Sequence, residues 1–334
     1  MRLEDFDYDL PEERIAQTPI EPRDAARLLV DRGSAPPQHL TVADLPTLLR
    51  PGDVVVVNES RVIPARLRLY RVTGGAVEVL LLEPLSADRT AWEALVRPAR
   101  RLRIGEELVT SDGRAIVRVG ERTAIGDTVR VEVVGPVLDV LDAYGEVPLP
   151  PYIHTPLVDP DRYQTVYASE PGSAAAPTAG LHLTPELIAR IAAGGVPVVA
   201  VELAVGLDTF QPVGEADPRD HRMHSERYRV PAAAWAACQT AERVVAVGTT
   251  TVRALESAAT RGELEGRTEL FLYRGRRFEV VDVLLTNFHL PRTTLLMMID
   301  AFIGPRWRAL YETALFEHYR FLSFGDAMLL DRHA

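Results

Sequence analysis

The chain carries near-continuous apolar runs that predict the buried strands of a parallel sheet. These runs are VVVVN at 54–58, PVVAVELAVG at 197–206 and RVVAVGTT at 243–250. Because a parallel strand is covered on both faces, it shows little alternation of apolar and polar residues. Helical patterns occur at 185–193, 231–241, 251–259 and 307–319, the last of them amphipathic. Strands that alternate with helices predict a layered α/β fold.

The stretch from about Leu67 to about Glu146 follows a different pattern. Short β-prone runs such as AVEVLLLEPL, AIVRVG and DTVRVEVVG follow one another, separated by turns rich in Gly and Asp and without a long helical pattern. Strands at this spacing predict a small antiparallel barrel or sandwich. We therefore expect an α/β main domain built from residues 1–66 and 152–334, with an antiparallel β-barrel domain inserted at 67–151.

Composition narrows the class of protein. No apolar run approaches the roughly 18 residues that span a bilayer, and the acidic N-terminus lacks the pattern of a secretory signal. The single cysteine, Cys238, excludes an internal disulfide framework and a cysteine-rich zinc site. We expect a cytoplasmic protein without membrane attachment and, by default, a monomer.

The basic residues are all arginine, because the chain contains no lysine. The net charge of −10 argues against indiscriminate binding of nucleic acid. Local arginine clusters could still contact RNA, and the alternative is solvated surface charge. The candidate contacts are Arg97, Arg100, Arg101, Arg103 and Arg276.

The segment 162–187, RYQTVYASEPGSAAAPTAGLHLTPEL, is crowded with Gly, Pro and small residues. Small side chains allow a ligand to approach the backbone closely. The segment passes Gly180 and His182 and then reaches Thr184-Pro185, which predicts a helix start with Thr as the cap. A loop-to-helix junction with an imidazole suits a polar ligand. The alternative is a tight surface connection without a ligand.

Three polar clusters follow predicted strands. They are Asn58–Arg61, Gly248–Arg253 and Thr286–His289. Each alone is more often capping or turn chemistry, but α/β proteins bind ligands at the carboxyl ends of their strands. Three clusters together indicate a shared site. The Gly248 segment matches neither dinucleotide nor ATP motifs, yet it remains compatible with a carboxylate at a helix N-terminus.

A histidine pair at 221 and 224, followed by Glu226, raises the question of a metal. Zinc uses such groups, but a third ligand at credible spacing is absent from the sequence. We therefore expect no metal site. A hydrogen-bonded loop, or acid–base chemistry by His224 or Glu226, is the preferred interpretation.

These segments together resemble the S-adenosylmethionine:tRNA ribosyltransferase-isomerase family of queuosine biosynthesis. The resemblance covers nearly the whole chain, and the segments that carry it include FDYDLPEERIAQTPIEPRDAARLLV, GDVVVVNESRVIPARL, VPLPPYI, the segment 162–187, MHSERYRVP, VGTTTVRALES, LLTNFHLPRTTLLMMI and YRFLSFGDAMLL. It implies the same α/β domain with an inserted β-barrel. It also implies transfer of the ribosyl part of S-adenosylmethionine, with isomerisation, to 7-aminomethyl-7-deazaguanine in tRNA, which gives epoxyqueuosine and releases adenine and methionine.

The resemblance implies S-adenosylmethionine as a co-substrate, tRNA as a partner, and no permanently bound cofactor. A sulfonium acidifies the neighbouring C5′ protons, so a positioned base can remove one, and a proton donor helps adenine to leave. The acid–base candidates, between which the roles stay open, are His182, Glu226, His224 and His289. The candidates for orienting or stacking on substrate are Asn58, Arg61, Tyr163, Tyr167, Thr178, Gly180, Thr249, Thr250, Arg253, Asn287 and Phe288. Each aromatic residue alone is more often core packing.

The sequence departs from the family pattern at a few positions. Ala204, Asp208 and Gln211 stand where the family has His, Gly and Arg, and a Y-P-G-Y motif is altered around Arg274. Two rival hypotheses follow. The chain could use the same donor on a small-molecule acceptor, or it could be a non-catalytic RNA-binding protein of the same fold.

Overall fold

The computed structural model describes residues 1–334 except 87, 124–127, 207–212, 216, 222 and 224. The chain divides into two compact units. The first unit comprises Met1–Ser60, Pro151–Glu170 and Ala176–Ala334. The second comprises Arg61–Pro150 and Pro171–Ala175. Along the sequence, the second unit is thus inserted into the first.

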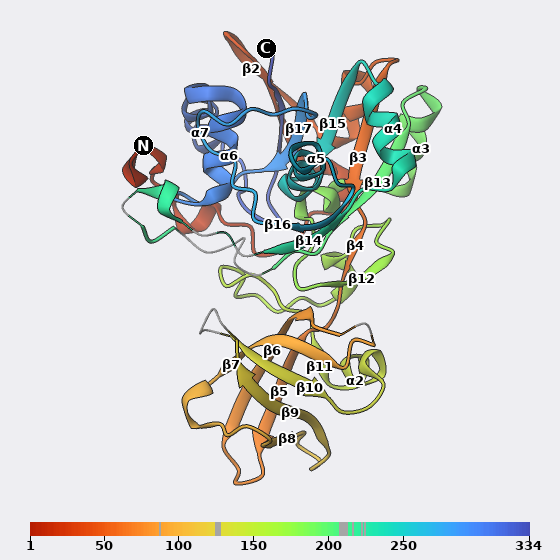
Figure 1. Ribbon diagram of the computed structural model, residues 1–334. Helices are drawn as coiled ribbons and strands as arrows, with labels where there is room; N and C mark the ends of the chain where they lie inside the picture. Colours follow the sequence, from red (N-terminus) through yellow and green to blue (C-terminus); the bar gives the residue numbers. More distant parts are fainter. Residues whose placement is uncertain (87, 124–127, 207–212, 216, 222, 224) are drawn as a thin grey trace. The chain divides into compact units, whose positions relative to one another are not determined.

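A mixed sheet is the centre of the first unit, and its described residues form nine strands in the order β16-β14-β13-β3-β15-β17-β18-β1-β2 (Figure 1). The strands are β1 (Arg27–Arg32), β2 (Ala35–Thr41), β3 (Asp53–Asn58), β13 (Val198–Leu203), β14 (Glu226–Arg229), β15 (Arg243–Val247), β16 (Glu265–Thr268), β17 (Val283–Asn287) and β18 (Ala327–Asp331). The neighbours β13, β3, β15 and β17 are parallel, as predicted for the apolar runs. Their carboxyl ends therefore lie at the same edge of the sheet.

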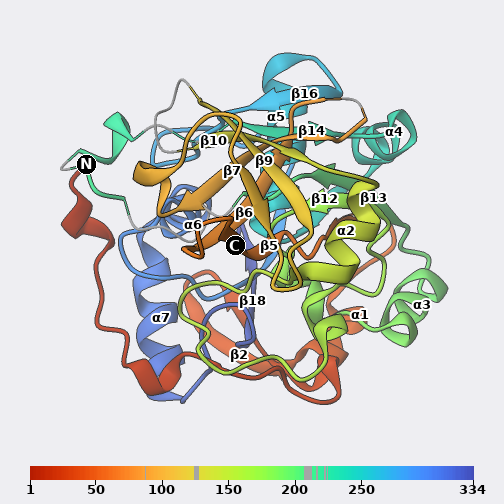
Figure 2. The same ribbon diagram turned by 90° about the horizontal axis from the view of Figure 1, so that it is seen from below.

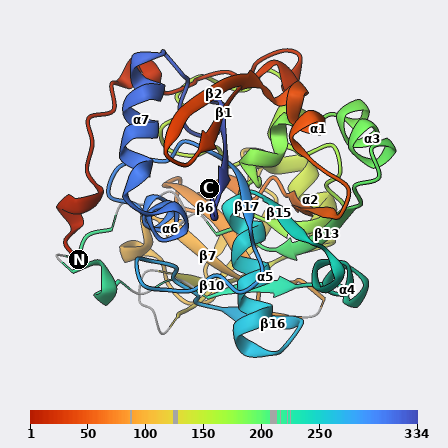
Figure 3. The ribbon, with the colours of Figure 1, turned by 90° about the horizontal axis from the view of Figure 1, so that it is seen from above.

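Helices cover both faces of this sheet, which explains why every residue of β3 is buried. The helices of the first unit are α1 (Leu45–Leu48), α3 (Pro185–Ala193), α4 (Ala232–Thr240), α5 (Thr249–Arg261), α6 (Thr294–Ile303) and α7 (Trp307–Phe316). Figure 3 shows α5, α6 and α7 on one side of the sheet and α1 and α3 on the other. Leu187 and Ile191 of α3 pack with alternate residues of the parallel strands in one apolar cluster. The predicted layered α/β fold is confirmed.

The second unit contains a closed antiparallel barrel. Its elements are β5 (Arg66–Arg71), β6 (Ala76–Pro84), β7 (Ala91–Arg97), β8 (Glu107–Val109), β9 (Ala115–Arg122), β10 (Val129–Val133), β11 (Gly145–Glu146) and α2 (Val137–Tyr144). Figure 2 shows the barrel strands in the orange and yellow part of the chain. The order β5-β6-β7-β10-β9-β8 is closed by pairing of β8 with β5, and β11 adds to β5. Strand β10 alternates buried and exposed residues, as a barrel wall requires.

A two-stranded sheet pairs β4 (Ser60–Val62) with β12 (Glu170–Ser173). Across the described residues, we find no helix with both the length and the apolar character needed to cross a lipid bilayer.

Candidate active site

The first turn of α5 begins at the carboxyl end of β15. Gly248, the residue before the helix, has φ of +88°, a backbone conformation that favours glycine, and it offers no side chain as a cap. The N–H groups of the first turn have no acceptor within the helix, so they remain available at the sheet edge. Thr249 and Thr250 add two hydroxyl groups at the same place.

Asn58, the last residue of β3, holds this edge together. Its Nδ2 donates to the Leu203 carbonyl at 3.0 Å and to Thr250 Oγ1 at 3.2 Å, while its Oδ1 accepts from the backbone N–H of Ser60 at 3.1 Å. Asn58 is fully buried, so these hydrogen bonds are needed to offset desolvation of its amide. Its role is to join the end of β3 to the end of β13 and the start of α5.

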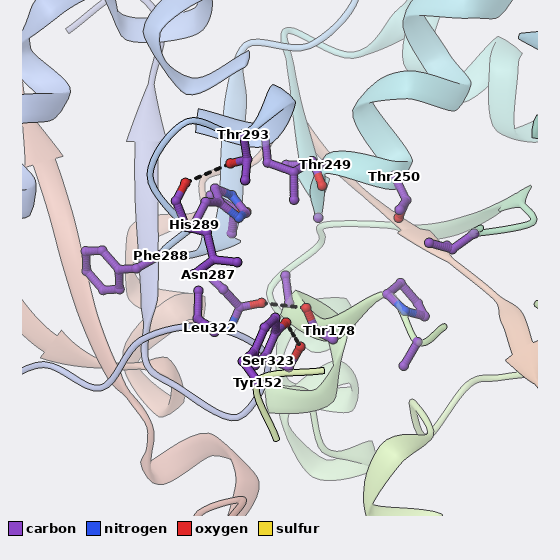
Figure 4. A pocket seen from close by; sticks show the side chains of 18 residues that line it. Tyr152, Thr178, Thr249, Thr250, Asn287, Phe288, His289, Thr293, Leu322 and Ser323 are labelled. Atoms are coloured by element: carbon purple, nitrogen blue, oxygen red, sulfur yellow. Dashed lines mark hydrogen bonds between the residues drawn. The ribbon is translucent and has the colours of Figure 1, made fainter. Parts of the chain in front are cut away.

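A pocket of about 580 Å³, open to solvent, lies at this edge (Figure 4), and we call it the main pocket. Its lining is rich in hydroxyl groups, which come from Tyr152, Thr178, Thr249, Thr250, Thr286, Thr293 and Ser323. Asn287 contributes an amide and His289 an imidazole, whereas Val205, Leu290, Leu295 and Leu322 supply apolar walls. The described lining residues include no carboxylate, guanidinium or ammonium group. A lining of apolar walls with a few convergent polar groups is typical of a small-molecule site.

Asn287, at the end of β17, connects the pocket to His182. Its Oδ1 accepts from Thr178 Oγ1 at 2.9 Å, and its Nδ2 faces His182 Nε2 at 3.2 Å and the carbonyl oxygen of Asp326 at 3.4 Å. The Asp326 carbonyl oxygen can only accept, so the amide group of Asn287 that faces it is the donor Nδ2. Nδ2 therefore also donates to His182 Nε2. The His182 proton is therefore on Nδ1.

His182 is neutral at pH 7. Burial lowers its pKa to about 4, and the positive charge of Arg320 lowers it further in the same direction. The 3-10 helix η7 (Thr178–His182) brings it beside Asn287. His182 does not line the main pocket; it lines a smaller one of about 240 Å³ with Arg23 and Arg162. Its link to the main pocket passes through the amide of Asn287.

His289 supplies the imidazole in the lining of the main pocket. Its ring lies among the other labelled side chains of the lining (Figure 4). Burial lowers its pKa to about 3, so the ring is neutral at pH 7. Nε2 contacts Thr286 Oγ1 at 3.0 Å. Nδ1 has no hydrogen-bond partner among the residues that the structure describes. The backbone N–H of His289 donates to Tyr311 Oη at 3.0 Å, which fixes the loop after β17.

Glu226 and Arg253 form a buried ion pair beside the main pocket. Glu226 also accepts from the Gly206 backbone N–H at 3.0 Å. Arg253 lines a second pocket that it shares with Thr249 and Thr250. The structure thus joins Arg253 to the two threonines, and it gives Glu226 the role of partner to Arg253.

Four other candidates, Tyr163, Tyr167, Gly180 and Phe288, pack into the protein. Tyr163 is fully buried and its ring meets Phe324 edge-on at 5.9 Å. Gly180 lies against Tyr167, whose hydroxyl oxygen would stand 2.0 Å from a Cβ at Gly180. Neither tyrosine lines the main pocket. Phe288 borders the pocket, but its ring points away (Figure 4) and packs against Tyr311, Tyr319 and Phe321.

The arginine candidates divide between the units. Arg61, Arg97, Arg100 and Arg103 belong to the second unit, where their side chains are exposed, and nothing is described of the Arg101 side chain. Arg276 belongs to the first unit, with its guanidinium 5.1 Å from the centre of the Tyr273 ring.

Some positions lie outside the described residues, namely His224, Asp208 and Gln211. Ala204 is half-buried and immediately precedes Val205 of the pocket wall. Arg274 makes a two-pronged ion pair with buried Asp300, at 2.9 and 2.8 Å. Within the described part of the chain, no cluster of three or more His, Cys, Asp or Glu side chains could hold a metal ion.

Three hydroxyl-bearing lining residues escaped the sequence reasoning. They are Tyr152, Thr293 and Ser323. Tyr152 Oη and Ser323 Oγ are 2.7 Å apart, although 171 positions separate them in the sequence. The available signal was their presence in the segments VPLPPYI, LLTNFHLPRTTLLMMI and YRFLSFGDAMLL, which carry the family resemblance.

Known proteins match this chain over nearly its whole length. A family model described as "Queuosine biosynthesis protein" matches residues 3–330. The S-adenosylmethionine:tRNA ribosyltransferase-isomerase of Symbiobacterium thermophilum is 52% identical over 343 residues, covering 99% of this chain and 100% of that protein. Its namesake from Moorella thermoacetica is 50% identical, with the same coverage. A crystal structure of S-adenosylmethionine tRNA ribosyltransferase from Thermotoga maritima is 36% identical, covers 97% of this chain and 99% of that one, and has a TM-score of 0.55.

Proposed function

Because the chain belongs to the family of queuosine biosynthesis proteins and is a transferase-isomerase of that pathway, we propose that its main pocket binds S-adenosylmethionine. The ribosyl part passes to 7-aminomethyl-7-deazaguanine at the wobble position of tRNA and is isomerised there. The nucleoside becomes epoxyqueuosine, and adenine and methionine are released.

The lining of the main pocket is the observation that carries this proposal. The described lining contains seven residues with hydroxyl groups, one amide and one imidazole, and no cationic side chain apart from any charge on that imidazole. A sulfonium is a fixed cation, and a nearby guanidinium or imidazolium would repel it. The lowered pKa values of His289 and His182 keep both rings uncharged at pH 7. Hydroxyl and amide groups can meanwhile hydrogen-bond the ribose and the adenine.

His289 is the residue to which we assign the first proton transfer. The sulfonium acidifies the adjacent C5′–H bonds, so a neutral ring nitrogen can take one proton. Nδ1 fits this role in the tautomer in which Nε2–H donates to Thr286 Oγ1, because Nδ1 then carries the free lone pair. A pKa of about 3 makes His289 a weak base, so the step depends on the acidity that the sulfonium supplies. Thr249 and Thr250 orient the sugar, which matters because the amine and the sugar must meet in one geometry.

The acceptor is a macromolecule, and the exposed arginines are the groups suited to its phosphates. Arg97, Arg100, Arg101 and Arg103 are the candidates on the second unit and Arg276 is the candidate on the first. We assign the 67–151 insertion to RNA contact as a domain of its own. The active form in this proposal is a cytoplasmic monomer without a permanently bound cofactor.

The test is a reaction with S-adenosylmethionine and tRNA that carries 7-aminomethyl-7-deazaguanine at the wobble position. We expect adenine in equal amount to nucleoside that has gained the mass of the epoxycyclopentanediol. A matched tRNA with guanine at that position controls for solvent-driven loss of adenine and should give none. Equal turnover with the free deazaguanine base would contradict tRNA as the acceptor. Donor binding without any adenine release would contradict transfer itself.

A further inference from the structure

A second pocket of about 350 Å³ adjoins the main one. The two share Thr249, Thr250 and Leu295 in their linings. Most of the remaining wall is apolar and includes Phe271 and Met298. The second pocket is therefore an apolar slot that opens beside the proposed ribose site.

The guanidinium of Arg253 is the charged group in the wall of this slot. The residue is only 4% exposed. Nη1 pairs with Glu226, and Nε donates to the Leu270 carbonyl at 3.2 Å. Nη2 is buried and has no hydrogen-bond partner among the residues that the structure describes. A buried charged donor without an acceptor is costly, so its presence next to a cavity indicates a missing anionic or carbonyl partner.

We propose that Nη2 of Arg253 binds the carboxylate of the methionine part of S-adenosylmethionine, and this rests on the proposed function of the main pocket. Guanidinium and carboxylate form short, charge-assisted hydrogen bonds. The carbon chain of the methionine part lies along the apolar slot. The sulfur then reaches the boundary that both pockets share, at Thr249 and Thr250. Both pockets thus hold one extended ligand.

Helix geometry supports this placement. Thr249 and Arg253 are one helical turn apart on α5 and therefore lie on the same face. The carboxylate can lie beside the guanidinium, on the side of the first turn of the helix, where anions are favoured. The carbon chain separates the sulfonium from Arg253, so the cation avoids the guanidinium. Met298, an unbranched side chain, can move to widen the slot.

The experiment compares two ligands by calorimetry: S-adenosylmethionine and its decarboxylated form, which keeps the sulfonium and the nucleoside. We expect the native protein to bind the decarboxylated ligand about 10- to 100-fold more weakly, the range for a lost charge-assisted hydrogen bond. Equal affinity of the native protein for the two ligands would overturn the proposal, and no variant is needed for that result. Failure to bind S-adenosylmethionine at all would instead remove the proposed function, and this inference with it.

A double variant, Arg253→Gln with Glu226→Gln, locates the effect without leaving a lone buried charge. We expect it to bind the two ligands with affinities within about threefold of each other, because the carboxylate has lost its partner. Arg261→Gln is the matched control, since Arg261 lies at the exposed end of the same helix and should keep the native preference. A double variant that is folded by circular dichroism and still discriminates 10-fold or more would also overturn the assignment.

Discussion

Because His182 is neutral in the folded protein, we predict how the free energy of unfolding falls in acid. Burial lowers its pKa to about 4 in the folded protein, whereas an unfolded histidine has a pKa near 6.5. Between these values the unfolded chain binds a proton that the folded chain does not. The stabilisation is therefore fully present above pH 6.5 and is lost as the pH falls through 4. The difference of about 2.5 pH units corresponds to about 3 kcal/mol of unfolding free energy.

The perturbation that isolates this effect is His182→Gln. The side-chain oxygen of glutamine can accept from Asn287 Nδ2, as His182 Nε2 does at 3.2 Å. Glutamine does not titrate, so the acid-sensitive contribution of position 182 should disappear. The drop in unfolding free energy from pH 7 to pH 4 should be about 3 kcal/mol smaller in the variant than in the native protein.

Urea denaturation at several pH values between 4 and 7 measures this difference. His154→Gln is the control, since the His154 side chain is exposed, and it should follow the native pH dependence. Nitrogen NMR of the imidazole rings provides an independent check, because we expect the His182 proton on Nδ1 at pH 7. An unchanged pH dependence in His182→Gln would refute the lowered pKa of His182, and a proton on Nε2 would refute the hydrogen bond assigned to Asn287.

Three further predictions concern packing, catalysis and RNA contact. Gly180→Ala should lower the unfolding free energy by about 1–3 kcal/mol in denaturant titrations, because the new Cβ would overlap the Tyr167 hydroxyl. His289→Gln should lower kcat for adenine release by about 10²- to 10⁴-fold, with the Kd for S-adenosylmethionine little changed in calorimetry. Joint replacement Arg100→Gln and Arg103→Gln should raise KM for tRNA and reduce the slope of log affinity against log salt by about 1 to 2, as filter binding would show.

Each of these predictions has a control and a contrary outcome. Gly214→Ala, where a Cβ would meet nothing within 4 Å, should leave stability unchanged, and equal losses at Gly180 and Gly214 would contradict the steric argument. Normal kcat in His289→Gln would remove His289 from proton transfer. Arg118→Gln is the barrel control, because Arg118 already pairs with Glu107 and Glu132. An equal loss of tRNA affinity in Arg118→Gln would contradict a specific role of Arg100 and Arg103 in RNA contact.

Local sequence rules predicted those elements that local chemistry determines. The predicted helix at 185–193 matches α3, whose Thr184 cap accepts from the Leu187 N–H at 3.1 Å. The turn-separated runs in the middle of the chain became the barrel strands. Helix α6 was missed, because eight of its ten residues are buried and its apolar sequence lacks the period of an amphipathic helix.

Elements that depend on distant partners could not be read from the sequence. Strand β1 pairs with β18, about 300 residues away, and neither has a local signal that specifies the other. The same limit applies to the site. Clusters at the ends of strands pointed to Thr250 and Asn287, because parallel strands bring their ends together. The pairing of Arg253 with Glu226 joins helix α5 to strand β14, and only the folded chain shows it.

The most direct test of the account is a crystal structure of this protein with S-adenosylmethionine bound. We predict adenosyl density against Thr249, Thr250, Asn287 and His289, with the methionine carboxylate at Arg253. Density for the whole donor at another surface, with the main pocket empty, would contradict the central claim that the ends of β3, β15 and β17 form its binding site.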